Sequence, residues 1–511
     1  MPHLTRRALL ASAAAAGTVR FRSAAGVDKV LRARSYADIA VIDPAFQKSS
    51  PEGDIINLTQ RKLVTYKPGT KWEWELDAAE KIEQTDPRTI SFALKPGVKW
   101  TNGFGEMSAD DVKYSFERIA DPENKSPYQG DWATLDKVEV TGKLTGVIHL
   151  KEPFAPLWGS TLPFGSGVIV CKAAVTQAGG KYTTKAPAES GPFLLKEWQP
   201  KQRTTLVRNP DYSGPKPEYD EIQIMPIDDE KSAEIAFQAG ELDFTWSSVG
   251  SIPIFQKTPP AHGKLQTRPP LAYVWLGISQ VAAPFDDIRV RQAVQKAVDV
   301  DAVLKAAYLG VAERATGIIA PGLLGHRDIK MPPRDVDGAK KLMAAAGKSN
   351  LQVHLSILNK AERATAAQVI QANLADIGMD VVIDSYDSGS YWTLGDKTAG
   401  DKWKTLQLMI SRFSMAPDPF YGTEWFTPDQ IGTWNWEQFD SKEFGDLHKA
   451  AIVETDTKKR GDMYVRMQDL MEQSGCYVFL THEVQGVLSR DSTQPALLPD
   501  GRPLHARFRP A

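Results

Sequence analysis

Three short segments of this 511-residue chain approach motifs of catalysis or cofactor binding, and none completes one. Gly347-Lys348-Ser349 has the end of a phosphate-binding P-loop, but Leu342 stands where the motif's first glycine belongs. His482-Glu483 begins a zinc-protease motif, yet position 486 is glycine instead of the second histidine. Gly165-Ser166-Gly167 lacks the frame of a nucleophile elbow and the third glycine of a dinucleotide turn. We therefore predict no catalytic residue and no cofactor.

Metal-ligating residues show no useful spacing either. The eight histidines are scattered, and no two are separated as ligands on one helix would be. The only cysteines, Cys171 and Cys476, form no CxxC pair. They either form a disulfide or remain two buried thiols, and we predict no metal site.

The chemistry that remains is that of binding. Tryptophan is frequent, with 13 residues, and five of them fall close together: Trp392, Trp403, Trp425, Trp434 and Trp436. Such rings can line a cleft that holds varied ligands by burial and stacking. The competing interpretation is a large hydrophobic core, which we expect to account for about half of these rings.

The elements that must position such a site are those of a mixed α/β protein. A strand from Leu351, a helix from about Ala361 ending at Gly378, and a strand at Val381-Val382-Ile383 predict a parallel βαβ unit. Ser108 and Asp111 predict a helix start with a capping box. The length exceeds what one core supports, so we expect two or more lobes.

The charge balance bears on the partners of the protein, and the first residues bear on its location. Lys and Arg number 61 against 63 Asp and Glu, which argues against a nucleic-acid-binding protein. Paired Arg6-Arg7, the weakly apolar Ala8 to Gly17 and Ser23-Ala24-Ala25 resemble a twin-arginine signal peptide over 1–25. We expect an exported, periplasmic, soluble protein without a lipid anchor. The alternative is that these first residues are the tail of a cytosolic protein and carry paired arginines by chance.

Four blocks then carry a resemblance to a known family. They are Phe92 to Trp100 followed by Ser108 to Phe116, Gly191-Pro192-Phe193 running on to Arg208 to Tyr212, Ala239 to Asp243, and Pro284 to Ala293. Together and in this order, these blocks resemble the family 5 extracellular solute-binding proteins, which serve peptide, opine and nickel ABC importers.

The resemblance implies a two-lobed periplasmic-binding-protein fold of type II, cluster C, with an extra subdomain in the first lobe. Lobe I would comprise 26–60, 172–270 and 480–511, the extra subdomain 61–171, and lobe II 271–479. Pro259-Pro260 and Pro269-Pro270 bracket the expected crossing between lobes, near 259–272. The implied partners are a small peptide-like molecule and an inner-membrane ABC permease, with the protein itself a monomer.

The resemblance also implies ligand contacts. Tyr128 matches a family tyrosine of the extra subdomain, Trp246 ends a strand where the family places an aromatic contact, and Trp392 matches a tryptophan of lobe II. Trp275, just ahead of Gly277, is placed similarly. For each ring, a turn or core position is the competing interpretation.

One segment departs from the family pattern. Peptide-binding members have an aspartate three residues before an Asp-Pro pair, where it holds the ligand's ammonium group, and this chain has Met415 there. Arg412, next to Phe413, replaces a usual tryptophan, so an anionic ligand becomes the hypothesis, with Arg412 pairing a carboxylate. A surface salt bridge is the alternative. Arg363, near a helix N-terminus, is a second anion candidate.

The sequence thus predicts capture and delivery of a peptide-like or opine-like molecule without chemistry. One rival hypothesis is that the same fold binds an oligosaccharide or a metal chelate. Another is that the protein is an exported hydrolase, although no sequence motif supports this.

Overall fold

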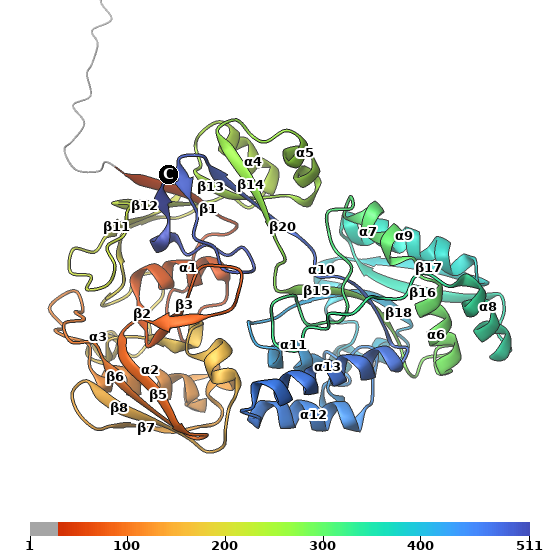
Figure 1. Ribbon diagram of the computed structural model, residues 1–511, viewed down its shortest axis with the longest axis horizontal. Coiled ribbons are helices and arrows are strands. Elements are labelled where there is room, and N and C mark those ends of the chain that lie inside the picture. The colour runs from red at the N-terminus through yellow and green to blue at the C-terminus, as the bar shows by residue number, and fades with distance from the viewer. Residues whose placement is uncertain (1–28) are drawn as a thin grey trace, which may run out of the picture.

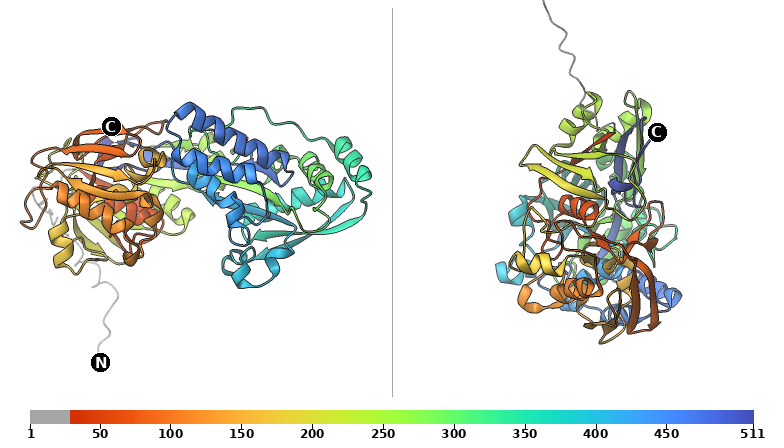
Figure 2. Two further views of the ribbon diagram at one scale, coloured as in Figure 1. Left: turned by 90° about the horizontal axis from the view of Figure 1, so that it is seen from below. Right: turned by 90° about the vertical axis from the view of Figure 1, so that its left-hand side faces the viewer.

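The computed structural model describes residues 29–511, which form two α/β lobes side by side (Figure 1). The expected signal peptide, 1–25, lies outside the described residues. Lobe I contains a seven-stranded sheet and carries an extra subdomain built on a four-stranded sheet, whereas lobe II contains a five-stranded sheet. Viewed from below, lobe II extends away from the body formed by lobe I and the extra subdomain (Figure 2).

The sheet of lobe I brings the ends of several strands to one edge. Its strands, in spatial order, are β10 (Phe193–Gln199), β11 (Arg203–Arg208), β12 (Glu221–Pro226), β1 (Val30–Ser35), β13 (Phe244–Ser247), β20 (Gln485–Arg490) and β14 (Gly263–Arg268). Its helices are α1 (Ser50–Thr59), α3 (Lys172–Gln177), α4 (Glu230–Gln238) and α5 (Ile252–Lys257). Because β1 runs parallel to both β12 and β13, the carboxyl ends of these three strands share an edge.

The extra subdomain packs one helix against an antiparallel sheet. The strands are β5 (Ala79–Asp86), β6 (Thr89–Leu94), β8 (Thr145–Leu150) and β7 (Leu135–Val140), and the helix is α2 (Ala109–Ala120). Short ladders flank them: β2 (Arg61–Lys62) with β9 (Val168–Ile169), and β3 (Val64–Tyr66) with β4 (Trp74–Leu76). The predicted capping box of Ser108 and Asp111 is confirmed at the start of α2.

Lobe II contains the predicted βαβ unit. Its sheet is ordered β17 (Met379–Tyr386), β16 (Leu351–Leu358), β18 (Leu408–Ser414), β15 (Ala272–Ile278) and β19 (Tyr477–Thr481). Its helices are α6 (Ile288–Ala297), α7 (Val300–Ala307), α8 (Val336–Ala345), α9 (Ala361–Ala375), α10 (Ser388–Tyr391), α11 (Phe420–Thr423), α12 (Lys442–Val453) and α13 (Thr457–Gln473). The parallel pairing of β16 with β17 around α9 confirms the unit, and apolar side chains of its strands and helix belong to one of the hydrophobic cores of this lobe.

Two chain crossings connect the sheets of the lobes. The first leads from β14 to β15 through Pro269-Pro270, and the second leads from β19 to β20 through residues 482–484. The chain ends in lobe I, with the short ladder of β21 (Thr493–Gln494) and β22 (Arg509–Pro510) (Figure 1). Among the described residues, no helix combines the length and apolar character needed to cross a membrane.

The extra subdomain also contacts lobe II directly. The Tyr421 hydroxyl donates to Asp131 Oδ1 at 2.5 Å, and the Ala155 amide donates to the Ile452 carbonyl at 2.7 Å. Phe154 and Phe420 meet edge to face, with ring centroids 6.2 Å apart. Lobe II is therefore held at its crossings to lobe I and again along its contact with the extra subdomain.

The junction between α2 and lobe I rests on a buried ion pair. Arg118 forms two hydrogen bonds to Asp43, at 2.9 and 2.6 Å, and both side chains are almost fully buried. We expect Arg118→Ala to lower the free energy of unfolding by about 3–5 kcal/mol, because it leaves a buried carboxylate unpaired. Denaturant unfolding measures this loss.

Lys458→Ala is the control, since it removes an exposed partner of Asp462 and should change stability by less than about 1 kcal/mol. Equal effects of the two substitutions would contradict the structural role given to Arg118.

Candidate functional site

A cavity of about 860 Å³ lies where the two lobes meet. Lobe I contributes the end of β1, the start of α1, Trp246 and a segment at Asp500 to Pro503. Lobe II contributes the start of α9 and the end of β18, and the first crossing closes one side. A molecule in this cavity would touch both lobes at once.

The position of the cavity follows from the direction of the strands in the two sheets. Parallel strands place their carboxyl ends at one edge, and open α/β sheets bind ligands outside that edge. In lobe I, β1 ends at Arg34 and Ser35, and β13 ends beside Trp246 and Ser248, all of which line the cavity. In lobe II, β16 leads to Lys360 and β18 ends at Ser414.

An ion-pair network lies beside the cavity in the second crossing. Glu483 accepts from Arg363 at 2.8 Å and from Arg412 at 2.9 Å. Burial favours the neutral acid, but the two guanidinium groups outweigh it and lower the pKa of Glu483. Glu483 adopts a left-handed backbone conformation, with φ of 65°. This conformation is uncommon for a residue with a side chain, so the surrounding contacts must hold it.

The two arginines of this network differ in exposure. The Arg363 side chain is 3% exposed and also donates to the Tyr308 hydroxyl. The Arg412 side chain is 41% exposed, donates to Ser414 Oγ at 3.0 Å and lines the cavity. Arg412 is therefore the arginine of the pair that a ligand in the cavity can reach.

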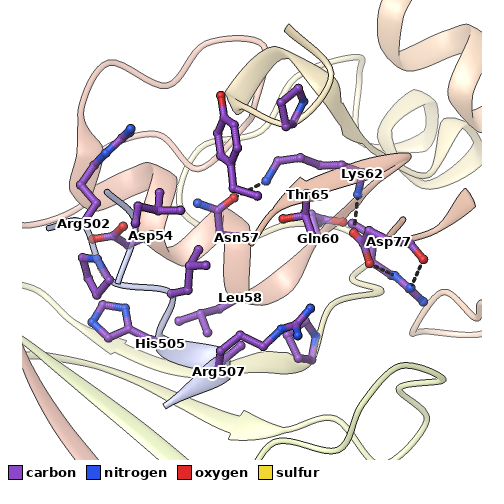
Figure 3. Close-up of a pocket in the computed structure, with 18 of the residues that line it drawn as sticks. Asp54, Asn57, Leu58, Gln60, Lys62, Thr65, Asp77, Arg502, His505 and Arg507 are labelled. Atoms are coloured by element: carbon purple, nitrogen blue, oxygen red, sulfur yellow. Dashed lines mark hydrogen bonds and ion pairs between the residues drawn. The ribbon is translucent and has the colours of Figure 1, made fainter. Parts of the chain in front are cut away.

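Asp54 of α1 contributes a carboxylate to the cavity wall. No hydrogen bond or ion pair to its side chain occurs within residues 29–511, although Arg502 lies nearby (Figure 3). Arg502 is itself paired with Asp500 at 2.6 Å. Burial raises the pKa of Asp54 to about 7, against the opposing influence of Arg502.

Asp54 stands at a junction of three hollows. It lines the large cavity, an adjoining pocket of about 230 Å³, and an inner pocket of about 90 Å³ inside lobe I. Figure 3 shows the inner pocket between α1 and the C-terminal segment, with Lys62 donating to Asn57 Oδ1 at 2.5 Å. The walls of the inner pocket include two buried atoms without a protein partner in the described chain, Gln60 Oε1 and His505 Nε2.

The structure brings four of the sequence-predicted residues to these hollows. Trp246, Arg412 and Met415 line the large cavity. Tyr128 lines the adjoining pocket, and its hydroxyl donates to the Gln47 carbonyl at 2.9 Å. Met415 is 8% exposed and also packs in a hydrophobic core of lobe II.

The other predicted residues lie outside the walls of the large cavity. Trp275 is 1% exposed and donates from Nε1 to Glu437 Oε1 at 2.7 Å, so it packs within lobe II. Gly277 lies against the same carboxyl, where an added Cβ would come within 2.1 Å of Glu437 Oε1. Burial raises the pKa of Glu437 to about 7. Arg363 is buried in the network described above.

Trp392 and Phe413 belong to an aromatic cluster of lobe II. Their rings stack with centroids 6.2 Å apart, and both rings are half-buried. Trp425 and Trp434 contact Phe413, while Trp436 contacts Trp392. The tryptophan-rich segment thus builds mainly a cluster within lobe II, and its rings are not among the walls of the large cavity.

Sequence reasoning missed several charged residues of the cavity: Arg34, Asp54, Lys360, Glu362 and Arg502. Each stands alone in an ordinary segment, without a motif or spacing that distinguishes it from a solvent-exposed charge. Only the meeting of distant chain segments identifies them.

Both cysteines, Cys171 and Cys476, are buried and free. They lie in different hydrophobic cores, one in the extra subdomain and one in lobe II. The thiol alternative therefore describes this structure.

The chain is similar in sequence to known solute-binding proteins. The family model described as bacterial extracellular solute-binding proteins, family 5, middle region, matches residues 73–433. A glutathione-binding protein, GsiB, of Pectobacterium atrosepticum is 27% identical over 437 residues, covering 81% of this chain and 82% of its own. Its Escherichia coli counterpart is 24% identical over 430 residues, with the same coverage.

Solved structures show the same fold. HbpA2 of Haemophilus parasuis superposes with a TM-score of 0.82 at 22% identity, covering 94% of this chain and 100% of its own. The periplasmic binding protein DppA of Helicobacter pylori, in complex with the peptide STSA, gives a TM-score of 0.71 at 25% identity, covering 91% and 94%.

Substitution of the two arginines of the Glu483 network should lower stability to different extents. Arg363→Met should lower the free energy of unfolding by about 3 kcal/mol or more, because it breaks a buried pair. Arg412→Ala should cost about 1 kcal/mol or less, because Arg412 is partly exposed and Glu483 keeps Arg363. Denaturant unfolding of both variants checks this contrast, and a reversed order would contradict it.

Proposed function

Because this chain belongs to the family 5 bacterial extracellular solute-binding proteins, we propose that it captures a peptide-like molecule between its lobes and delivers it unchanged to the permease of an ABC importer. The observation that carries the proposal is the large cavity, whose walls come from both lobes. Its volume suits a small ligand, since ligand pockets in proteins measure about 300–1,000 Å³.

The mechanism requires closure but no bond breaking. The lobes hinge about Pro269-Pro270 and residues 482–484, and a ligand that touches both walls binds the closed form more tightly than the open form. Ligand shifts the population toward closure only by this difference in affinity. The permease then recognises the closed form and receives the ligand.

The proposed ligand is peptide-like and carries a carboxylate. The curated relatives are glutathione-binding proteins, and a structural neighbour holds a peptide, which supports this class. Arg412 faces the cavity and can pair a carboxylate, while Trp246 and Met415 offer apolar surface. Tyr128 would contact a ligand that extends into the adjoining pocket.

We place the protein in the periplasm, as a monomer that does no chemistry on its ligand. The extracellular character of the family and the periplasmic neighbours support the location. The family's role in transport supports a binding protein over a hydrolase.

Ligand binding should stabilise the native state. At a concentration of about 100 times Kd, a ligand adds about 2.7 kcal/mol to the free energy of unfolding. We expect glutathione or short peptides to raise Tm in a thermal-shift screen, and mass spectrometry to recover the bound compound unaltered. No shift with any peptide, or recovery of a cleaved product, would overturn the proposed function.

Arg412→Ala should weaken binding of a carboxylate ligand about 10- to 100-fold, because a charge-assisted hydrogen bond is lost. Calorimetry with the ligand found in the screen measures this loss. Arg289→Ala is the matched control, since Arg289 is an exposed, paired arginine of lobe II outside the cavity walls. Unchanged affinity in Arg412→Ala would remove Arg412 from the site.

A further inference from the structure

We infer that Asp54, on the lobe I wall, binds the protonated amino group of the ligand, and that the cognate ligands are anionic or zwitterionic peptide-like molecules with a free amine. This inference rests on the proposed function and specifies its ligand class. It also places the amine anchor on lobe I, whereas the position on lobe II expected to hold it is Met415.

The first support is the position of Asp54. Its side chain lines the large cavity and also the two pockets that open from it, so a ligand in any of these hollows approaches the same carboxylate. Asp54 lies in the second turn of α1, and the acidic residue of the first turn is Glu52. The helix N-terminus therefore does not account for the carboxylate.

The second support is the lack of a counter-ion. Arg502, which lies near Asp54 in Figure 3, is paired with Asp500, and no donor within residues 29–511 bonds to Asp54. Burial accordingly raises the pKa of Asp54 to about 7, as expected for a carboxylate without a partner. A bound ammonium group would supply the missing charge and donors.

The other acids of the cavity have ordinary explanations. Glu230 and Glu362 occupy the first turns of α4 and α9, where a negative charge favours the helix. Asp500 is paired with Arg502, and Asp228 is exposed to solvent. Among the described residues of this wall, Asp54 is thus the acid that is neither paired, nor in the first turn of a helix, nor fully exposed.

The opposite charges on the two walls of the cavity suit a ligand that carries both an amine and a carboxylate. Asp54 comes from lobe I and Arg412 from lobe II, and both line the same cavity. A molecule with an amine and a carboxylate would pair with both walls only when the lobes close, which gives the differential affinity that closure needs.

The experiment pairs a neutral isostere of Asp54 with ligands whose amino group carries no charge. Calorimetry compares wild type with Asp54→Asn, using glutathione and trialanine, each with a free and an acetylated amino group. We expect wild type to prefer the free amine about 10- to 100-fold, and Asp54→Asn to lose this preference while binding the acetylated forms as wild type does.

Glu189→Gln is the matched control. Glu189 is a buried carboxyl of lobe I whose pKa burial also raises to about 7, and it is not among the cavity walls. This variant should keep the wild-type preference for the free amine.

The outcomes separate the two proposals. If wild type binds none of the four probes, the proposed function fails and this inference fails with it. If wild type binds free and acetylated forms equally, or if Asp54→Asn weakens both forms to the same extent, the inference alone is overturned. Should Asp54→Asn not fold, Asp54→Ser is measured with the same four probes, and the same outcomes apply to it.

Discussion

The structure depends on one constraint, which is that two chain crossings carry every covalent connection between the sheets of the lobes. Glu483 occupies one of these crossings in a left-handed conformation, held by Arg363 and Arg412. Both arginines belong to lobe II, so the crossing is fixed to that lobe by charge as well as by the chain.

The two arginines of this network have different surroundings. Arg363 is almost fully buried and bonds to Tyr308, so it stabilises lobe II. Arg412 keeps a large exposed fraction and lines the cavity. Because Arg412 shares Glu483 with the hinge, a carboxylate bound there would act on the crossing itself. Ligand binding and lobe closure would then be coupled through one guanidinium group.

The extra subdomain adds a second restraint. Its contacts to lobe II, through Asp131, Phe154 and Ala155, lie away from the crossings. Burial raises the pKa of Asp131 even though Tyr421 donates to it. These contacts therefore favour the arrangement in which lobe II lies against the extra subdomain.

Local sequence patterns determined much of the fold, because they depend on neighbours along the chain. The alternation from Leu351 and the capping box at Ser108 predicted a βαβ unit and a helix start that the structure confirms. The proline pair at Pro269-Pro270 lies between the strands of the first crossing. The ordered family blocks predicted the two-lobed architecture, since sequence carries ancestry even where the physical pattern is weak.

The site was decided by tertiary structure. The number of tryptophans could not show whether the rings line a cleft or pack in a core, since burial favours these rings in both places. Trp275 lies in a core of lobe II. Asp54 and Arg502 carry no local signal, because an isolated charge is usually solvated. They come together because α1 and the C-terminal segment, hundreds of residues apart along the chain, both line the cavity that Arg412 also lines. Packing leaves Asp54 partly buried and without a hydrogen-bond donor within residues 29–511, and no local pattern predicts this combination.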